Sequence, residues 1–510
     1  MSTRSEPAIS LADLVGYLKE PSSYAHDVEG EIEVHETHIS VVLLVGEYAY
    51  KIKRPLKTEF LDYSTLQKRK YYCEEELRLG RRYAENLYLK VVPIGWSDHR
   101  IGVDVDGAAV EYAVMMRRFP NGALLSEQAD AGTLSTPAII CLAKEVAEFH
   151  QSARVCDLGF ADGWYDFLET NSASLFDQLA LTVPPHLAMT LSDVRRWSDD
   201  FLANHRGLFL QRIQDGYIRE CHGDMHLQNV VMLDGKPVLF DGIEFNDRLR
   251  WIDTLSDMTF LSMDLAFRGH LELARSFTNA YLERMSDYRS ARLMRWFSTY
   301  RAIIRAMAAS MKAEQVELGV AARTAAREEA DNHVALAHQF TLATEPELWI
   351  THGVSGSGKT TASETVVRRH GAIRLRSDIV RKNAFCMGAG ELASEQETAE
   401  IYSESSTRAT YESLYRTAAD ILSGGYSVVI DATFLRRRDR RDFRRLADEK
   451  CVSFKILDCR ADAQTLRRRI ADRMERNDDA SDADISVLTV QLATQEPLTD
   501  EELQFVRSAE

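Results

Sequence analysis

The order of apolar and polar positions predicts a mixed strand-and-helix fold in the first third of the chain. An amphipathic pattern, LADLVGYLKE, predicts a short helix closed by Pro21, and helical spacing returns over residues 64–88. Alternating or continuous apolar runs predict strands around that second helix. These runs cover residues 31–45, 47–54, 89–96 and 101–119. The pattern predicts a small sheet that carries one helix.

Helical spacing dominates the middle of the chain, and a regular alternation of strands and helices follows it. From Ser135 to about Ile218, and again up to about Gln339, apolar residues recur mainly at helical intervals. The segment TLATEP, residues 341–346, has the character of a short linker. From Glu347 onward, strand patterns alternate with helical ones, which predicts a parallel sheet.

The composition is that of a soluble globular protein with more than one core. The chain has 510 residues, of which 45% are hydrophobic and 27% charged. A net charge of −16 argues against general polyanion binding, which needs a basic surface. The longest apolar run, residues 39–45, is too short to cross a membrane, and the N-terminus lacks a signal-peptide pattern. Seven scattered cysteines without a C-x-x-C pair indicate no zinc knuckle or disulfide framework, which fits a cytoplasmic protein.

The most informative motif of the N-terminal half is HGDMHLQN, residues 222–229. Asp-Gly between the apolar runs VVML and KPVLF predicts a tight hairpin directly after it. The hairpin returns the chain to Asp241, close to Asn229, so two oxygen ligands converge as a hard cation such as Mg²⁺ requires. Asp224 can then accept the proton of a substrate hydroxyl or orient that hydroxyl. The arrangement predicts phosphoryl transfer.

A cation for the phosphates is expected upstream, on the strand YAYK. Lys51 can contact the α- and β-phosphates while it pairs with Glu76 on the EEELRL helix, with Glu75 as the alternative partner. Lys53 lies on the same strand face, so the choice between the two lysines stays open. The pattern EYAVMMRRF predicts the strand and hinge beside adenine. Backbone contacts to the base are expected at Met115, Met116 and Arg117.

HGDMHLQN and the Asp241 that follows the hairpin resemble the aminoglycoside phosphotransferase and choline kinase group, within the protein-kinase-like fold. The resemblance covers roughly residues 1–340. It implies an α+β bilobal domain with a small lobe of about residues 1–118 and a large lobe of about residues 119–340.

This resemblance also assigns roles to individual residues. It implies that Asp224 is the catalytic aspartate and Lys51 the phosphate lysine. Asn229 and Asp241 are the implied metal ligands. Two features of the group's relatives are missing: no G-x-G-x-x-G loop precedes the Lys51 strand, and no A-P-E-type activation segment follows Asp241. The second departure favours a small-molecule kinase over a protein kinase.

Other polar residues near the motif are interpreted as structural. His222 is expected to be a hydrogen-bonded core histidine, and His226 to support the loop or to line the substrate side. A structural role is also favoured for four residues after Asp241, with lining of the acceptor site as the alternative. These residues are Glu244, Asn246, Asp253 and Asp257.

A second phosphate motif, GVSGSGKT, lies at residues 353–360, between the apolar strand LWIT and the helical pattern TASETVVRR. It fits G-x-x-x-x-G-K-[ST], in which backbone N–H groups and a helix N-terminus surround the β-phosphate. Lys359 is expected to bridge the β- and γ-phosphates, and Thr360 to offer its hydroxyl to Mg²⁺. The predicted nucleotide-binding residues are Gly353, Ser355, Gly356, Ser357, Gly358, Lys359, Thr360 and Thr361.

Charged residues downstream of this motif predict a kinase rather than a motor or a GTPase. Asp378 in RSDIVRK can activate an acceptor hydroxyl, while the neighbouring Arg376 and Arg381 hold an anionic or polar substrate. Asp431 ends the buried strand SVVIDATF, where it can hold a metal-bound water. The pattern LRRRIADRMERND carries arginines at i and i+4, which could close over the phosphates. These two arginines are Arg469 and Arg473.

The Walker motif, RSDIVRK and these arginines resemble P-loop kinases such as gluconate kinase, the zeta-toxin kinases and the kinase domain of polynucleotide kinase. The resemblance covers about residues 346–510 and implies that Asp378 is the acceptor-side base and Arg469 or Arg473 a lid arginine. The basic run FLRRRDRRDFRRLADEK could grip a phosphorylated substrate or nucleic acid. A solvated helix with Leu435, Phe443 and Leu446 facing inward is the favoured interpretation.

The sequence therefore predicts a cytoplasmic, ATP- and Mg²⁺-dependent enzyme with two kinase domains, residues 1–340 and 347–510. Each domain is expected to phosphorylate a hydroxyl of a small polar acceptor, such as a sugar, an amino sugar or a nucleoside-like metabolite. One alternative makes one domain a nucleotide-binding regulator of the other, and a second makes the C-terminal domain a nucleic-acid 5′-hydroxyl kinase. Neither a membrane nor a nucleic-acid partner is expected, and the sequence leaves the oligomeric state open.

Overall fold

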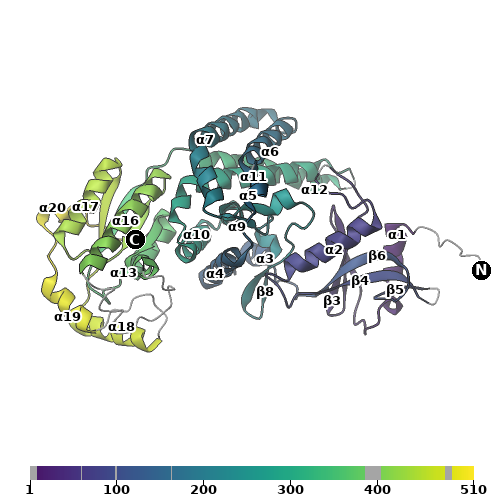
Figure 1. Ribbon diagram of the computed structural model, residues 1–510, viewed down its shortest axis with the longest axis horizontal. Helices are drawn as coiled ribbons and strands as arrows, with labels where there is room; N and C mark the ends of the chain where they lie inside the picture. The colour runs from purple at the N-terminus through teal and green to yellow at the C-terminus, as the bar shows by residue number, and fades with distance from the viewer. Residues whose placement is uncertain are drawn as a thin grey trace, which may run out of the picture. The chain divides into compact units, whose positions relative to one another are not determined.

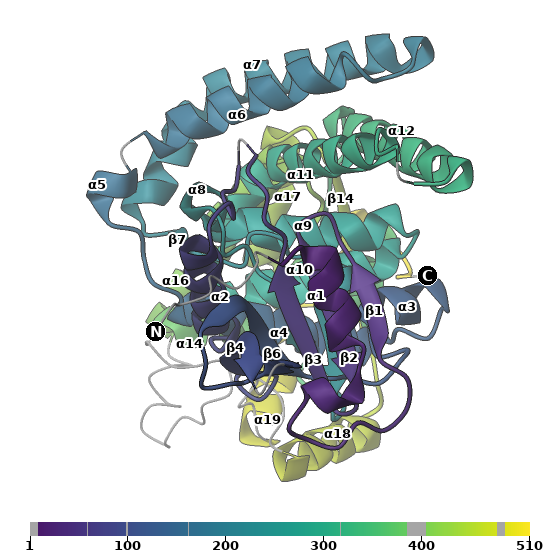
Figure 2. The same cartoon turned by 90° about the vertical axis from the view of Figure 1, so that its right-hand side faces the viewer.

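The computed structural model describes residues 9–58, 60–97, 100–161, 163–316, 318–384, 404–476 and 485–509 (Figure 1, Figure 2). Its contacts divide the chain into two compact units. The first unit comprises residues 1–134, 148–162 and 212–257, and the second comprises residues 135–147, 163–211 and 258–510. Helices that precede the segment 341–346 thus group with the C-terminal part of the chain.

A six-stranded antiparallel sheet forms the core of the first unit, in the strand order β1-β2-β3-β6-β4-β5. Helix α1 (Leu11–Leu18) packs into the apolar cluster on one face, and α2 (Leu66–Gly80) packs into the cluster on the other. The strands are β1 (Glu33–Glu36), β2 (Ser40–Val45), β3 (Tyr48–Lys53), β4 (Tyr88–Ser97), β5 (Arg100–Val103) and β6 (Ala109–Arg117). The predicted sheet with its long helix is present.

Side-chain alternation along β3 decides which of its residues face α2. Tyr50 and Ile52 pack into the apolar cluster that contains α1, and Ala49 packs into the cluster that contains α2. Because successive side chains of a strand point to opposite faces, Lys51 and Lys53 also emerge on the α2 side. The local strand period therefore brings both lysines toward the polar face of α2.

The predicted hairpin lies between β8 (Val230–Leu233) and β9 (Lys236–Leu239), which pair antiparallel. Its turn residues, Asp234 and Gly235, have φ values of 48° and 77°, the left-handed conformation that Asp-Gly accommodates in a two-residue turn. A second antiparallel pair, β7 (Ile218–Glu220) with β10 (Trp251–Asp253), frames this segment. The turn chemistry thus returns the chain to Asp241, as predicted.

Helices make up most of the chain between the first sheet and residue 341. They are α3 (Leu125–Asp130), α4 (Thr136–Ser152), α5 (Leu158–Ala161), α6 (Trp164–Leu179), α7 (Ala188–Gln214), α8 (Asp247–Arg250), α9 (Thr254–Phe267), α10 (Leu271–Met285), α11 (Ala291–Ala313) and α12 (Val320–Thr341). Within the second unit, side chains such as Phe176, Phe260, Ile303 and Val334 form one apolar core. Among the helices of the described ranges, none is long and apolar enough to cross a membrane.

The C-terminal part is an α/β domain built on a parallel four-stranded sheet in the order β12-β13-β11-β14. The strands are β11 (Glu347–His352), β12 (Ile373–Arg376), β13 (Val428–Asp431) and β14 (Ser453–Asp458). The helices are α13 (Lys359–His370), α14 (Ser377–Ala384), α16 (Glu404–Ser423), α17 (Arg437–Glu449), α18 (Ala463–Arg476), α19 (Ile485–Thr494) and α20 (Asp500–Leu503) (Figure 1). The expected fold class, a kinase-like α+β part followed by a P-loop α/β domain, is confirmed.

Helix α10 covers the open edge of β12 within the second unit. Asn279 Oδ1 accepts a hydrogen bond from the N–H of Arg374 (2.7 Å), and Asn279 Nδ2 donates to the carbonyl of Ala372 (3.1 Å). One helical turn further on, Glu283 forms ion pairs with Arg374 (3.3 Å) and Arg376 (3.5 Å). A side-chain amide therefore takes the place of a neighbouring strand at this sheet edge.

Candidate active sites

In the first unit, strand β3 and helix α2 meet through a buried carboxylate. Glu76 Oε1 lies 2.9 Å from Lys51 Nζ, and Glu76 Oε2 lies 2.7 Å from Lys53 Nζ. Burial opposes ionisation of Glu76, but the two ammonium groups outweigh it and lower its pKa to about 2. Burial would likewise lower the pKa of Lys51, yet Asp241 and Glu76 raise it well above its ordinary value. Glu76, Lys51 and Lys53 are therefore all held charged. The predicted Lys51–Glu76 pair is present.

Exposure separates the two candidate lysines. Lys53 is fully buried and also binds Glu244, which accepts a hydrogen bond from Tyr63 as well. Lys51 forms its second ion pair with Asp241, whose side chain is 41% exposed. Only Lys51 of this pair thus faces the open side of the site, which favours it as the phosphate lysine. Glu75, the alternative partner, pairs instead with Arg78 (2.6 Å) and Arg250 (2.9 Å).

The predicted base and metal ligands come together after the hairpin. Asn229 Nδ2 donates to the main-chain carbonyl (2.9 Å) and to Oδ2 (3.1 Å) of Asp224, and it lies 3.4 Å from the carbonyl oxygen of Asp241. The Asp224 side chain is 40% exposed, similar to that of Asp241. Asp241 has a φ of 62°, and the N–H groups of Asp241 and Gly242 donate to the hydroxyls of Tyr88 (2.9 Å) and Tyr83 (3.0 Å). Sequence patterns gave no signal for these two tyrosines.

Residues interpreted as structural make structural contacts. His222 is buried, its Nε2 lies 2.9 Å from the carbonyl of Phe240, and burial lowers its pKa. Asp257 accepts hydrogen bonds from the N–H groups of His222 (2.7 Å) and Gly223 (3.0 Å), which fixes the loop before Asp224. His226 Nε2 lies 3.3 Å from Asp224 Oδ2 and so supports the same loop.

The other residues of that group are also engaged inside the first unit. Asp253 binds Arg212, with 2.7 Å between Oδ1 and Nη2. Asn246 caps α8, because its Oδ1 accepts from the N–H of Arg248 (3.0 Å). Glu244 binds Lys53, as described above. These contacts agree with the structural interpretation over the acceptor-site alternative.

The backbone groups expected to bind adenine are used inside the sheet. Met115 and Met116 belong to β6, which has β3 on one side and β4 on the other. The N–H of Arg117, the last residue of β6, donates to the carbonyl of Leu87 (2.9 Å). This differs from the expectation, because a central strand has no unpaired backbone to offer a base. Arg117 and the residues that follow it, 118–120, line a cavity of about 690 Å³ at the strand exit.

The glycine-rich loop of the second unit connects β11 to α13, as the Walker pattern predicts. A Cβ atom at Gly353 would lie 2.4 Å from the carbonyl oxygen of Cys459, so this position excludes a side chain. Gly356 and Gly358 have φ values of 80° and 95°, which glycine adopts without strain. Lys359 Nζ folds back to donate to the carbonyl of Val354 (2.9 Å). The loop is thus built as a phosphate cradle at the N-terminus of α13.

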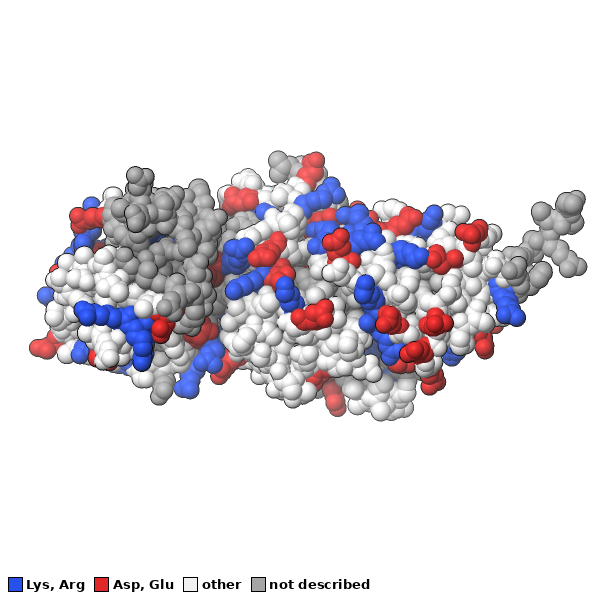
Figure 3. Space-filling model, turned by 90° about the horizontal axis from the view of Figure 1, so that it is seen from below, with Lys and Arg blue, Asp and Glu red and all other residues white. Residues whose placement is uncertain are grey.

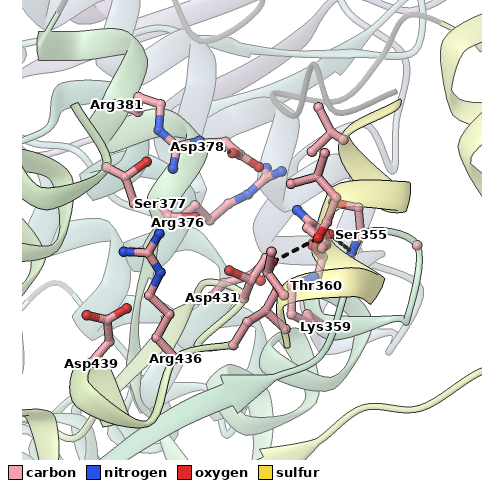
Figure 4. A pocket seen from close by; sticks show the side chains of 18 of the residues that line it. Ser355, Lys359, Thr360, Arg376, Ser377, Asp378, Arg381, Asp431, Arg436 and Asp439 are labelled. Carbon is pink, nitrogen blue, oxygen red and sulfur yellow. Dashed lines mark hydrogen bonds and ion pairs between the residues drawn. The ribbon is translucent and has the colours of Figure 1, made fainter. Parts of the chain in front are cut away.

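A cavity of about 710 Å³ opens beside this loop and collects most of the predicted residues (Figure 4). The predicted residues that line it are Ser355, Gly356, Gly358, Lys359, Thr360, Thr361, Arg376, Asp378, Arg381, Asp431 and Arg469. Gly353 and Ser357 are not lining residues. Ser357 packs behind the loop, where its Oγ would be 2.6 Å from a Cβ at Gly353. The side chain of Arg473 lies outside the described residues.

Contacts within the cavity hold the polar side chains in place. Asp378 pairs with Arg381 (3.2 Å) at one end, and Ser363 Oγ lies 3.4 Å from Asp431 Oδ2 near the loop. Figure 4 shows Asp431 beside Thr360 and Lys359, apart from Asp378. Arg469 Nη1 donates to the carbonyl of Gly356 (3.1 Å), so this arginine reaches the loop itself. A carboxylate, a cation and the helix N-terminus therefore face one space.

Arg436, Asp439 and Gln491 are among the lining residues that were not predicted as site residues. Arg436 and Asp439 come from the start of α17, and burial raises the pKa of Asp439. Arg436 belongs to the arginine run, which gave a signal that was interpreted as a solvated helix. Gln491 comes from α19, and its Oε1 accepts a hydrogen bond from the N–H of Ser355 (2.7 Å). No local pattern marks Gln491 in the sequence.

The interpretation of the arginine run as a solvated helix holds only in part. Arg441 and Arg445 are exposed, whereas Arg440 is 1% exposed. The Arg440 guanidinium binds Glu502 (2.7 Å) and donates to the carbonyls of Glu496 (3.2 Å) and Pro497 (3.2 Å), along with two carbonyls near the start of α17. On the face shown in Figure 3, basic and acidic side chains are interspersed.

Comparison with known proteins gives one family match and several relatives. Residues 348–498 match the family described as AAA domain. The uncharacterized protein Rv2004c of Mycobacterium tuberculosis is 30% identical over 469 residues, which is 90% of this chain and 90% of that protein. The uncharacterized protein Mb2027c of Mycobacterium bovis has the same identity and coverage.

Solved structures resemble each part of the chain separately. A choline/ethanolamine kinase family protein from Mesorhizobium loti covers 64% of this chain and 98% of its own, with 12% identity and a TM-score of 0.36. A gluconokinase from Sinorhizobium meliloti covers 32% of this chain and 81% of its own, with 18% identity and a TM-score of 0.22.

Proposed function

This chain belongs to the same family as the uncharacterized mycobacterial proteins Rv2004c and Mb2027c, and from its two phosphate-handling sites we propose that it is a bifunctional phosphotransferase. The chain is an ATP-dependent kinase. In the proposal, each site transfers the γ-phosphate of ATP to a hydroxyl of a small polar acceptor. Residues 1–340 carry the first site and residues 347–510 the second, as two kinase domains.

The first site is supported by the way its charged side chains are placed relative to one another. Lys51 is itself buried, but it pairs with Glu76 on one side and with the half-exposed Asp241 on the other, and Asp224 is also half exposed. In the proposed reaction Lys51 binds the phosphates of ATP, and Asp224 orients the acceptor hydroxyl and takes its proton. The hydroxyl oxygen forms the new bond to phosphorus while the bond to ADP breaks.

The residues around Asn229 suit a hard cation. Because Asn229 Nδ2 donates to Asp224, its Oδ1 is the side-chain atom left to act as an acceptor. The Asp241 carboxylate supplies a second, half-exposed oxygen donor in the same loop. Oxygen donors of this kind are what Mg²⁺ takes from proteins. Bound Mg²⁺ would neutralise charge on the triphosphate.

The second site is supported by one open cavity that is lined by residues for both ends of a transfer reaction. The loop N–H groups, Lys359 and Thr360 occupy the phosphate end, with Asp431 as the carboxylate placed to hold a hydrated Mg²⁺. Asp378 stands at the other end, where it would accept the acceptor proton, and Arg469 would neutralise charge on the phosphates. A cavity of about 710 Å³ accommodates a nucleotide tail and a small molecule better than a polymer.

The observation that carries the proposal is that each unit gathers its own cation and its own carboxylates without residues from the other. The experiment is incubation with Mg·ATP and a polar metabolite extract, scored by mass for new phosphorylated products. We expect Asp224→Asn and Lys359→Ala to remove different products. Exposed positions provide matched controls in Asp200→Asn and Lys312→Ala. Loss of every product from either single variant would refute independent sites. Products that survive both changes combined would refute the assignment of the two reactions to these sites.

A further inference from the structure

Helix α19 forms one wall of the second cavity, although it lies far from the Walker motif in the sequence. Leu488 packs into an apolar cluster with Val354 of the loop and with Leu466 and Ile470 of α18. Five residues of the same helix line the cavity: Ser486, Val487, Val490, Gln491 and Thr494. Leu488 therefore anchors α19 beside the phosphate loop.

The contact between Gln491 and the loop fixes which way its carboxamide points. The N–H of Ser355 is a donor, so the atom that meets it at 2.7 Å is the amide oxygen, Oε1. The Nε2 amino group, with two N–H donors, is then directed away from this N–H. Ser355 and Gln491 both line the space that holds Lys359 and Asp378. Because Gln491 lines this space, its amino group is the donor that the side chain can offer to an oxygen atom bound there.

The position of Ser355 in the loop indicates which phosphate is involved. Lys359 and Thr360 start α13 and mark the end where the β-phosphate is bound. Ser355 is the third residue of the motif, at the opposite end of the loop. A group anchored there lies beyond the β-phosphate, on the side from which the acceptor approaches.

We propose that Gln491 is a further residue of the second site, whose Nε2 donates a hydrogen bond to the γ-phosphoryl group of ATP. This inference rests on the proposed function and adds a contact that distinguishes ATP from ADP. During transfer the acceptor oxygen bonds to phosphorus, the bond to the β-phosphate oxygen of ADP breaks, and the acceptor proton passes to Asp378. Gln491 neither gains nor loses a proton, and its neutral donor stabilises charge on the phosphoryl oxygens.

The segment after α19 keeps this donor in position. The N–H of Glu496 donates to the carbonyl of Leu435 (2.9 Å), and Arg440 binds the carbonyls of Glu496 and Pro497 from the other side. The helix therefore carries Gln491 on a support that is fixed before nucleotide binds. A donor held in advance contributes more to transfer than one that must be ordered on binding.

A competing interpretation is that Gln491 only closes an empty loop and leaves when nucleotide enters. The two interpretations predict opposite effects of truncation. A donor to the γ-phosphoryl group strengthens binding of ATP but leaves ADP unaffected. A plug weakens binding of both nucleotides, so that its removal would strengthen both.

The test is the affinity of the full chain for Mg·ADP and for Mg²⁺ with the non-hydrolysable analogue β,γ-imido-ATP, measured without acceptor. We expect Gln491→Ala and Gln491→Glu to weaken analogue binding about 10-fold or more while ADP binding stays within a few-fold of wild type. The Lys359→Ala variant, which disables the second loop, isolates the signal of that site. Gln495→Ala, an exposed glutamine on the same segment, serves as the matched control and should leave both affinities unchanged.

An unchanged ratio of analogue to ADP affinity in both Gln491 variants would refute the inference, and so would tighter binding of both nucleotides. A wild-type chain with no Lys359-dependent nucleotide binding would refute the proposed function of this site together with the inference. Because the readout is binding, it separates these outcomes without knowledge of the acceptor.

Discussion

Lys51 and Asp241 form a direct ion pair that joins strand β3 to the turn after the β8–β9 hairpin. The predicted phosphate lysine and a predicted metal ligand thus neutralise one another. Both charges are needed at the triphosphate, where Lys51 would meet phosphate oxygens and Asp241 a cation. Entry of Mg·ATP would therefore exchange one ion pair for two new ones rather than expose unpaired charges.

Substitution of the two lysines on β3 should have different effects, one mainly on phosphoryl transfer and the other mainly on stability. Lys51→Met should lower transfer at the first site by roughly 10²-fold or more with little loss of fold, because it removes a partner of the transferred charge. Lys53→Met should instead destabilise the first unit by about 3–5 kcal/mol, since it leaves the buried Glu244 without its ammonium partner and takes one of two ammonium partners from Glu76. Urea denaturation together with mass-detected transfer measures both effects. A folded, inactive Lys53→Met chain would reverse the assignment.

Acid should weaken the second unit through His333. Burial lowers the pKa of this histidine from 6.5 to about 4, and the ring stacks on Phe267 with 3.7 Å between centroids. The unfolded chain binds the proton first, so stability is complete above about pH 6.5 and falls as the pH drops toward 4. The loss by pH 4.5 should be roughly 2–3 kcal/mol. His333→Phe should reduce this part of the slope when unfolding is compared at pH 7 and pH 4.5, and an unchanged slope would contradict the expectation.

Asn279 should protect the edge of β12. Asn279→Ala removes an acceptor from the N–H of Arg374 and a donor from the carbonyl of Ala372, at a cost of about 1–3 kcal/mol. Hydrogen exchange at the Arg374 amide should accelerate in this variant. Asn279→Asp keeps the acceptor and should protect that amide better than alanine does. Glu272→Gln, at an exposed position of α10, is the control that should leave exchange unchanged.

Arg440 should be structural and its exposed neighbours dispensable. Arg440→Met leaves Glu502 and four nearby carbonyls without their donor, which should cost about 3–5 kcal/mol. Because the same guanidinium supports the segment after α19, nucleotide affinity at the second site should also fall. Arg441→Met on the same helix should change neither. Equal behaviour of the two variants in denaturation and nucleotide titration would show that burial of Arg440 has no energetic consequence.

Features set by local chemistry could be predicted from the sequence. Asp-Gly between apolar runs fixed the hairpin, and with it the approach of Asp241 to Asn229. Strand alternation placed Lys51 and Lys53 on one face, and the half-exposed partner of Lys51, against the full burial of Lys53, is what favours Lys51. The Walker motif defined its loop because glycine conformation and helix start are both local properties.

Features set by distant partners could not be predicted. Gln491 meets Ser355 across 136 residues, and no periodicity connects the two. The hydroxyls that hold the turn at Asp241 come from Tyr83 and Tyr88, which the sequence pattern includes in the helical segment 64–88 without marking them. Arg440 sits in a run of arginines that looks uniformly solvated, and only its partner Glu502 distinguishes it. Such pairings depend on tertiary placement rather than on propensity.

The shared carboxylate of Glu76 makes the first site hard to dismantle. Withdrawing α2 from the sheet would remove the shared carboxylate from two ammonium groups at once, one of them with no access to water. Regulation by displacement of α2 from the sheet is therefore energetically unfavourable. We therefore expect the first site to stay assembled in the absence of substrate, so that substrate binding alone controls whether transfer occurs.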